Sequence, residues 1–256
     1  MDLQLKGKAA VVTGATRGIG RAIAELLAEE GADVAICARK ADEVDRAVDA
    51  LGRRGVEAFG KAVDIADGAQ LKAFVTEAGD TLGGIDILVS NASALANTPS
   101  EHDWRAMFEV DMLGAVRCYE AAAARLESAA AAKGDAAFLI ISSVSAAESN
   151  APSAYGPMKA ALIHYAKGLS RQLAAKKVRV NVISPGTVYV EDGVWGNFKR
   201  NAPDFFDQMI KRNPTGRMGT PEEIAAAAAF LCSPRSSFTT GINMLVDGSI
   251  TSRVNF

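Results

Sequence analysis

The sequence predicts an α/β fold: a single-domain, doubly wound parallel sheet of about seven strands with helices on both faces. Three observations predict it. The chain of 256 residues is 49% hydrophobic, enough to bury one large core. Short runs rich in Val and Ile recur along it, and longer segments with helical spacing separate them. Strands joined by helical crossovers must run parallel, which buries both faces of the sheet.

The predicted strands are almost continuously apolar, as strands buried on both faces should be. In chain order they span residues 9–13, 34–38, 56–63, 85–90, 138–142, 178–183 and 242–246. Between them, apolar residues recur at helical spacing, for example at Ile23, Leu26 and Leu27. Sheets of this kind bind ligands beyond the carboxyl ends of their strands, so we expect functional residues just after each run.

Side chains that can cap a helix mark the predicted helix starts. Ser100 and Thr220 are each followed three residues later by a carboxylate, which is typical of a helix N-terminus. A further helix contains Pro157, which it can tolerate if Ser153 is the N-cap, because the proline then falls in or just past the first turn.

Composition excludes several classes of function. The formal charge is −2, and no segment gathers the basic residues that a nucleic acid requires. The three cysteines and two histidines lack disulfide or metal-ligand spacing. The first ten residues lack the apolar core of a secretory signal, and the longest apolar run, 224–232, is shorter than the ~20 residues of a membrane span. We therefore expect a cytoplasmic protein with no nucleic-acid, metal or membrane partner.

Residues 1–256 show no repeat and no linker, so a single domain is expected. Segment 189–218 breaks the alternation of strands and helices. It mixes glycine and charge with the apolar side chains Trp195, Phe198, Phe205, Phe206 and Met209. We interpret this segment as a substrate lid.

Three glycines follow the first strand and open a helix. Gly14, Gly18 and Gly20 lie where backbone amides and the helix dipole can hold a phosphate. Their spacing matches neither G-x-G-x-x-G nor the P-loop. Tight packing of the strand against the helix would also explain any one of them.

Four motifs together resemble the short-chain dehydrogenase/reductase family. They are Thr13-Gly-Ala-Thr-Arg-Gly-Ile-Gly20, Asn91-Ala92, Tyr155-Gly-Pro-Met-Lys159 and Pro185-Gly186, and the resemblance extends from Leu5 to about Gly248. It implies that residues 1–256 form a single dinucleotide-binding and catalytic domain, whose Rossmann-like sheet binds a nicotinamide dinucleotide. It also implies a small-molecule carbonyl or alcohol substrate and a homodimer or homotetramer. The sequence as a whole is similar to the 3-oxoacyl thioester reductase branch of this family.

The resemblance also implies which residues contact the cofactor. They are Gly14, Thr16, Arg17, Gly18, Ile19, Gly20, Arg39, Asp64, Ile65, Asn91, Tyr155, Lys159 and Val188. Val188 offers backbone groups to the nicotinamide, although valine stands at position 190 where the family usually has threonine. The match at Asn91 departs from the family's Asn-Ala-Gly turn, because position 93 is serine. Asp64 matches an adenine-binding carboxylate, but it could equally cap the following helix.

The end of the second strand indicates the cofactor's type. No acid stands at Ala38 to bind a ribose 2′-OH, and Arg39 comes next. Arg17 lies inside the glycine turn, and two guanidinium groups favour the 2′-phosphate of NADP. The alternative is that both arginines are solvated surface residues.

Tyr155 and Lys159 lie four residues apart on a predicted helix, so they share a face. A free phenol has a pKa near 10, and a neighbouring ammonium favours its ionised form, which suits acid–base catalysis. The resemblance implies a serine that binds the substrate carbonyl. We assign this role to Ser143, because strand-end alignment favours it with a loop one residue shorter, whereas the family's usual spacing to the tyrosine favours the rival Ser142.

Asp111 stands where the family has an asparagine that supports a proton relay. An aspartate keeps the acceptor oxygens but adds a charge that could pair with Lys159. The expected activity is an NADP-dependent carbonyl reductase. The alternatives are an NAD(P)-dependent alcohol or polyol dehydrogenase and a non-catalytic dinucleotide-binding sensor or scaffold, for which Asp111 is the only hint.

Overall fold

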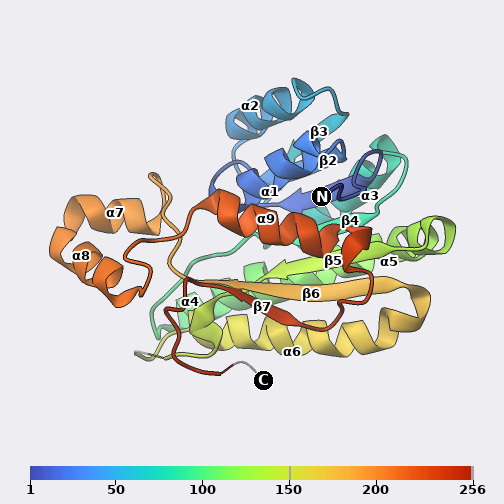
Figure 1. Cartoon of the computed structure of the whole chain (residues 1–256). Helices are drawn as coiled ribbons and strands as arrows, with labels where there is room; N and C mark the ends of the chain where they lie inside the picture. Colours follow the sequence, from blue (N-terminus) through green and yellow to red (C-terminus); the bar gives the residue numbers. More distant parts are fainter. Residues whose placement is uncertain (150, 255–256) are drawn as a thin grey trace.

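The computed structural model, which describes residues 1–149 and 151–254, confirms the predicted fold. One parallel sheet of seven strands has the order β3-β2-β1-β4-β5-β6-β7 (Figure 1). The strands are β1 (Ala9–Thr13), β2 (Asp33–Ala38), β3 (Ala58–Ala62), β4 (Ile87–Ser90), β5 (Ala136–Ile141), β6 (Val178–Pro185) and β7 (Asn243–Val246). The strand order reverses at β1 and β4, and ligands of such sheets bind in the crevice at this reversal.

Helices cover both faces of the sheet. Alternate residues of β1 enter two apolar layers: Val11 packs with α3, α5 and α6, whereas Ala10 and Val12 pack with α1, α2 and α9. Within the described ranges, no helix is both long and apolar enough to cross a membrane. The α-helices are α1 (Gly18–Glu29), α2 (Ala41–Gly52), α3 (Gly68–Thr81), α4 (Glu101–Met107), α5 (Gly114–Lys133), α6 (Tyr155–Leu173), α7 (Val194–Asn201), α8 (Pro203–Arg212) and α9 (Pro221–Cys232).

The helix starts follow the predicted caps at two of three places. Ser100 accepts a hydrogen bond from the N–H of Asp103, and Thr220 forms a complete capping box with Glu223. The prediction for Ser153 is wrong, because α6 begins at Tyr155 and its capping position is Ala154, whose methyl side chain cannot accept a capping hydrogen bond. Pro157 still lies in the first turn, where the missing N–H would have no helical partner.

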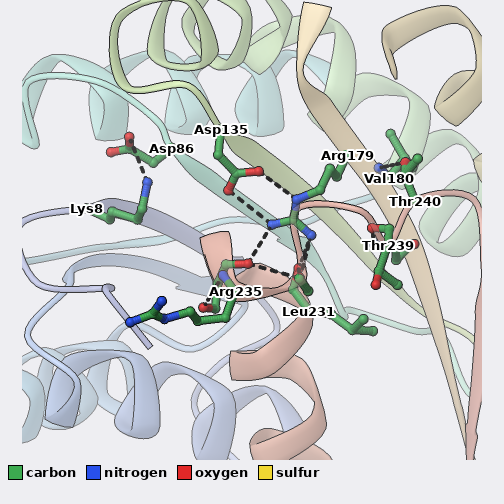
Figure 2. Close-up of polar contacts among 12 residues, drawn as sticks. Lys8, Asp86, Asp135, Arg179, Val180, Leu231, Arg235, Thr239 and Thr240 are labelled. Atoms are coloured by element: carbon green, nitrogen blue, oxygen red, sulfur yellow. Dashed lines mark hydrogen bonds and ion pairs between the residues drawn. The ribbon is translucent and has the colours of Figure 1, made fainter. Parts of the chain in front are cut away.

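A buried ion pair joins the elements at the amino ends of the strands (Figure 2). The guanidinium of Arg179, at the start of β6, lies 2.6 Å from Asp135 Oδ1, and both side chains are less than 10% exposed. Its other N–H groups donate to Asp135 Oδ2, the carbonyl oxygens of Leu231 and Ser233, and Ser236 Oγ. All five donors are therefore satisfied, which burial of a guanidinium requires.

Candidate active site

The glycine turn between β1 and α1 needs all three glycines. Gly14 and Gly18 have φ of 66° and 57°, in the left-handed region that favours glycine. A Cβ on Gly14 would lie 2.9 Å from Ala92 Cα, and one on Gly20 would clash with the Asn91 side chain. Packing and backbone conformation both require glycine at position 14, packing requires it at position 20, and backbone conformation requires it at position 18.

The start of α1 suits the diphosphate of a dinucleotide. Arg17 is its capping position and gives the helix no side-chain hydrogen bond, and no acidic residue occupies the first turn. The first N–H groups of the helix are therefore not capped by a side chain, and the helix dipole adds positive potential there. A backbone cradle of this kind fits an anion, which is what the predicted cofactor offers.

Asn91, just after β4, holds the glycine turn in place. Its Nδ2 donates to the carbonyl oxygens of Thr13 and Gly14, both at 3.0 Å. Thr13 Oγ1 accepts in return from the N–H groups of Asn91 and Ala92. The Asn91 side chain thereby fixes the position of the turn relative to β4.

The predicted residues for the adenosine half lie along the same edge. Asp64 is exposed and accepts from the N–H of Ala66, and the cap of α3 is Asp67 rather than Asp64. Ile65 is buried. Arg17 and Arg39 are exposed, and neither forms an ion pair with another residue that the structure describes.

Beyond β6, the chain passes close to the glycine turn. Val188 forms a parallel bridge with Gly219, and the Gly219 N–H donates to the carbonyl oxygen of Thr187 at 2.9 Å. A Cβ on Gly18 would lie 3.4 Å from Val190 Cγ2. The segment that begins the predicted lid is therefore anchored beside the glycine turn, with valine rather than threonine facing it.

Tyr155 and Lys159 occupy successive turns at the start of α6. Lys159 is 2% exposed, and its Nζ lies 5.5 Å from the centre of the Tyr155 ring. The same Nζ donates to the carbonyl oxygen of Ile141, at the end of β5, at 3.1 Å. The ammonium is therefore held between the phenol and the carboxyl end of the sheet.

Asp111 lies in a π-helical turn, Phe108–Leu113, between α4 and α5. Its Oδ2 is 2.9 Å from Lys159 Nζ, and both side chains are at most 3% exposed. Its Oδ1 accepts from the N–H of Ala94 at 2.9 Å. Burial lowers the pKa of Lys159, but the charges of Asp111 and Tyr155 and the bond to Asp111 together raise it above its usual value.

The two candidate serines have different hydrogen-bond partners. Ser142 Oγ donates to the carbonyl oxygen of Lys159 at 2.8 Å, so its proton is engaged within the protein. Ser143 Oγ accepts from the N–H of Ser145 at 3.1 Å, and no described acceptor takes its proton. A Cβ on Gly156 would lie 2.7 Å from the Ser145 carbonyl oxygen, so the turn after Ser143 packs on the first turn of α6.

The predicted lid folds into α7 and α8, which lie away from the sheet (Figure 1). The rings of Trp195, Phe198 and Phe205 pack on one another, with centroids 5.0–6.2 Å apart. At the end of α8, Arg212 lies 3.0 Å from Glu148, which stands on the loop between Ser143 and Tyr155. The lid is thereby joined to the segment that links the two candidate catalytic residues.

One charged residue at this edge was missed in the sequence. Glu43, in the first turn of α2, contacts both Thr16 and Lys40. An acidic residue about twenty positions past a dinucleotide-binding turn is a sequence signal for contact with the adenosine ribose.

Comparisons with known proteins extend over nearly the whole chain. The family model described as Enoyl-(Acyl carrier protein) reductase matches residues 14–251. Isoepoxydon dehydrogenase of Penicillium expansum is 36% identical over 251 residues, which cover 96% of this chain and 95% of that protein.

Two solved structures have the same fold throughout. L-Sorbose reductase from Gluconobacter frateurii, complexed with NADPH and L-sorbose, has a TM-score of 0.90 and 31% identity, covering 99% of this chain and 100% of that one. A 7α-hydroxysteroid dehydrogenase complexed with NADH and 7-oxo glycochenodeoxycholic acid has a TM-score of 0.89 and 32% identity, covering 99% and 98%.

Proposed function

Because the chain belongs to the short-chain dehydrogenase/reductase family of oxidoreductases, we propose that it is an NADP-dependent enzyme that interconverts a carbonyl and a secondary alcohol. The observation that carries the proposal is the buried Lys159 ammonium, held between the Tyr155 ring and the Asp111 carboxylate beside the end of β5. The cofactor supplies the hydride donor or acceptor when bound.

Tyr155 is the proton donor in reduction and the proton acceptor in oxidation. The adjacent ammonium of Lys159 stabilises the phenolate and so makes proton exchange possible near neutral pH. Ser143 donates a hydrogen bond from its hydroxyl to the substrate oxygen and stabilises the charge that develops there. Ser142 Oγ already donates its hydrogen bond to the carbonyl oxygen of Lys159, which supports Ser143 for this role. Asp111 positions Lys159 and takes the place of the relay asparagine.

NADP is the proposed cofactor because Arg17 and Arg39 are exposed and without ion-pair partners in the described parts of the chain. The cradle of Gly14, Gly18 and Gly20 would hold the diphosphate, and Val188 would hold the nicotinamide. The complex of L-sorbose reductase with NADPH supports this choice, whereas the complex of the hydroxysteroid dehydrogenase contains NADH.

The aromatic cluster of α7 and α8 supports a lid, residues 189–218, over an apolar substrate such as a 3-oxoacyl thioester or a similar ketone. We also propose that the protein is a homodimer or homotetramer and is located in the cytoplasm. The second candidate is an alcohol or polyol dehydrogenase that runs oxidatively, which the names of two dehydrogenases among the relatives favour.

Replacement of the phenol tests the enzyme assignment. In Tyr155→Phe we expect kcat to fall about 100-fold or more, the usual contribution of general acid–base catalysis, with NADPH affinity retained. The assay is NADPH consumption with a panel of ketones, beside fluorescence titration of NADPH.

Tyr165→Phe is the matched control, because Tyr165 lies on the same helix and packs against the core cluster. A Tyr155→Phe variant that keeps most of its turnover contradicts the mechanism. A wild-type protein that binds NADPH but reduces none of the ketones in the panel favours the sensor or scaffold instead.

A further inference from the structure

Glu43 forms a bridge between two segments at the candidate cofactor site. Its Oε1 accepts from Lys40 Nζ at 2.8 Å, and its Oε2 accepts from Thr16 Oγ1 at 3.2 Å. Thr16 belongs to the glycine turn, and Lys40 follows Arg39 at the capping position of α2. The carboxylate therefore joins the two loops that carry Arg17 and Arg39.

The carboxylate of Glu43 is ionised at neutral pH. The hydrogen bond from Lys40 is the main cause that holds the pKa of Glu43 below its usual range, and the charge of Arg17 adds to it. Its side chain is 29% exposed, so it faces solvent as well as its partners. A fixed negative charge thus lies beside Arg17, one of the two proposed phosphate ligands.

The two nicotinamide cofactors differ at this edge of the site only by the 2′-phosphate. A carboxylate repels that phosphate. Its ion pair with Lys40 also offsets part of the positive charge that Lys40 would otherwise present to the phosphate. The same carboxylate can accept a hydrogen bond from a ribose hydroxyl, the role that an acid near the end of the second strand has in NAD-binding sheets. Both effects reduce the preference for NADPH that two arginines create.

Resting on the proposed binding of a nicotinamide dinucleotide, we propose that Glu43 is a specificity-determining residue that opposes the 2′-phosphate and lets this chain bind NADH as well as NADPH. Arg17 and Arg39 attract the phosphate, Glu43 counteracts them, and the measured preference is the difference between the two. The sequence departs from a simple NADP pattern because the acid absent at position 38 is supplied from the first turn of α2.

Fluorescence titration with NADPH and with NADH tests this assignment, because it needs neither a substrate nor turnover. We expect the ratio of the NADH Kd to the NADPH Kd of the wild-type protein to be less than about ten. Glu43→Gln should raise the ratio of the NADH Kd to the NADPH Kd by about threefold to tenfold, and Glu43→Lys should raise it further. The NADPH Kd of Glu43→Gln should also increase more steeply with KCl, since the remaining charges attract the phosphate more strongly.

Asp42→Asn is the matched control. Asp42 is the preceding residue of the same helix, and it pairs with Arg46 at 2.9 Å rather than with the cofactor loops. This variant should leave the ratio unchanged, whereas Arg39→Asp should lower it.

An unchanged or lower ratio in both Glu43 variants overturns the role of Glu43 and leaves the proposed function intact. Failure of the wild-type protein to bind either nucleotide overturns the proposed function, and the Glu43 inference with it.

Discussion

Asp111 and Lys159 form a fully buried ion pair at a position where the family usually carries an asparagine. The carboxylate Oδ2 lies 2.9 Å from the ammonium, and Oδ1 accepts from the N–H of Ala94. An asparagine can keep the bond to Ala94 through its carbonyl oxygen, but it cannot balance the lysine charge. The carboxylate oxygen of Asp111, in place of the NH2 group of an asparagine, therefore keeps the pKa of Lys159 high.

Replacement of the carboxylate should therefore change the pH dependence of turnover. The pKa of Lys159 is raised, so the stabilisation from the pair is complete at neutral pH and is lost only as pH rises through that pKa. In Asp111→Asn, the charge that does most to offset burial is lost, so the pKa of Lys159 falls and the lysine loses its proton at lower pH. We expect the alkaline limb of the kcat profile to move to lower pH.

Glu109→Gln is the control for that measurement, because Glu109 lies in the same π-helical turn and pairs with Arg117 instead. A profile in Asp111→Asn that superposes on the wild type would remove Asp111 from the proton path.

The paired helices α7 and α8 have few ties to the rest of the molecule. Their aromatic rings pack mainly on one another, and Arg212 joins the end of α8 to Glu148. Asn213, the next residue, is buried and its Nδ2 lies 3.4 Å from the carbonyl oxygen of Asp247. Loss of the ion pair should therefore loosen the lid while its base stays attached.

Glu148→Gln should raise hydrogen exchange in residues 194–212 by about twofold to fivefold, the range expected for an exposed ion pair of up to ~1 kcal/mol. Hydrogen-exchange mass spectrometry measures this without cofactor or substrate. A charge swap, Glu148→Arg with Arg212→Glu, should restore protection.

The control variant for the lid is Glu127→Gln, which removes the exposed pair of Glu127 with Lys176 at 2.7 Å, remote from the lid. Equal exchange in wild type and Glu148→Gln would exclude the pair as a tether.

Across the whole molecule, the candidate site and the buried ion pair of Asp135 with Arg179 lie at opposite ends of the strands. The candidate site follows the carboxyl ends of β1, β4, β5 and β6, whereas Asp135 and Arg179 join β5, β6 and α9 at the amino ends (Figure 2). Changes in that network should affect folding without touching the cofactor site.

Arg179→Met should reduce the free energy of unfolding by about 3–5 kcal/mol, because it leaves the Asp135 carboxylate buried without a counter-charge. Urea unfolding measures the loss. Arg54→Met, which breaks an exposed pair with Glu29 at 3.1 Å, should cost less than about 1 kcal/mol. Equal costs for the two variants would contradict the structural role of the buried pair.

Local patterns allowed much of this protein to be predicted. The strand at 9–13 is observed with the predicted bounds, and the caps at Ser100 and Thr220 are confirmed, since periodicity and capping depend on residues close in the chain. Ser153 failed as a cap because contacts of the preceding loop, such as the bond from the Ala154 N–H to the Thr98 carbonyl oxygen, set where α6 begins.

The sequence by itself determined the parallel sheet, the family and the residue types at the site, because hydrophobic spacing and the glycine and Tyr-x-x-x-Lys motifs are read along the chain. The sequence allowed the pairing of Asp111 with Lys159 to be anticipated, but only the tertiary structure decided the partners of Asp135 and Glu43. It placed Asp111 on Lys159, Asp135 on Arg179, and Glu43 between Thr16 and Lys40. Most of these partners are far apart in sequence, and strand order and helix packing, rather than spacing along the chain, bring them within bonding distance.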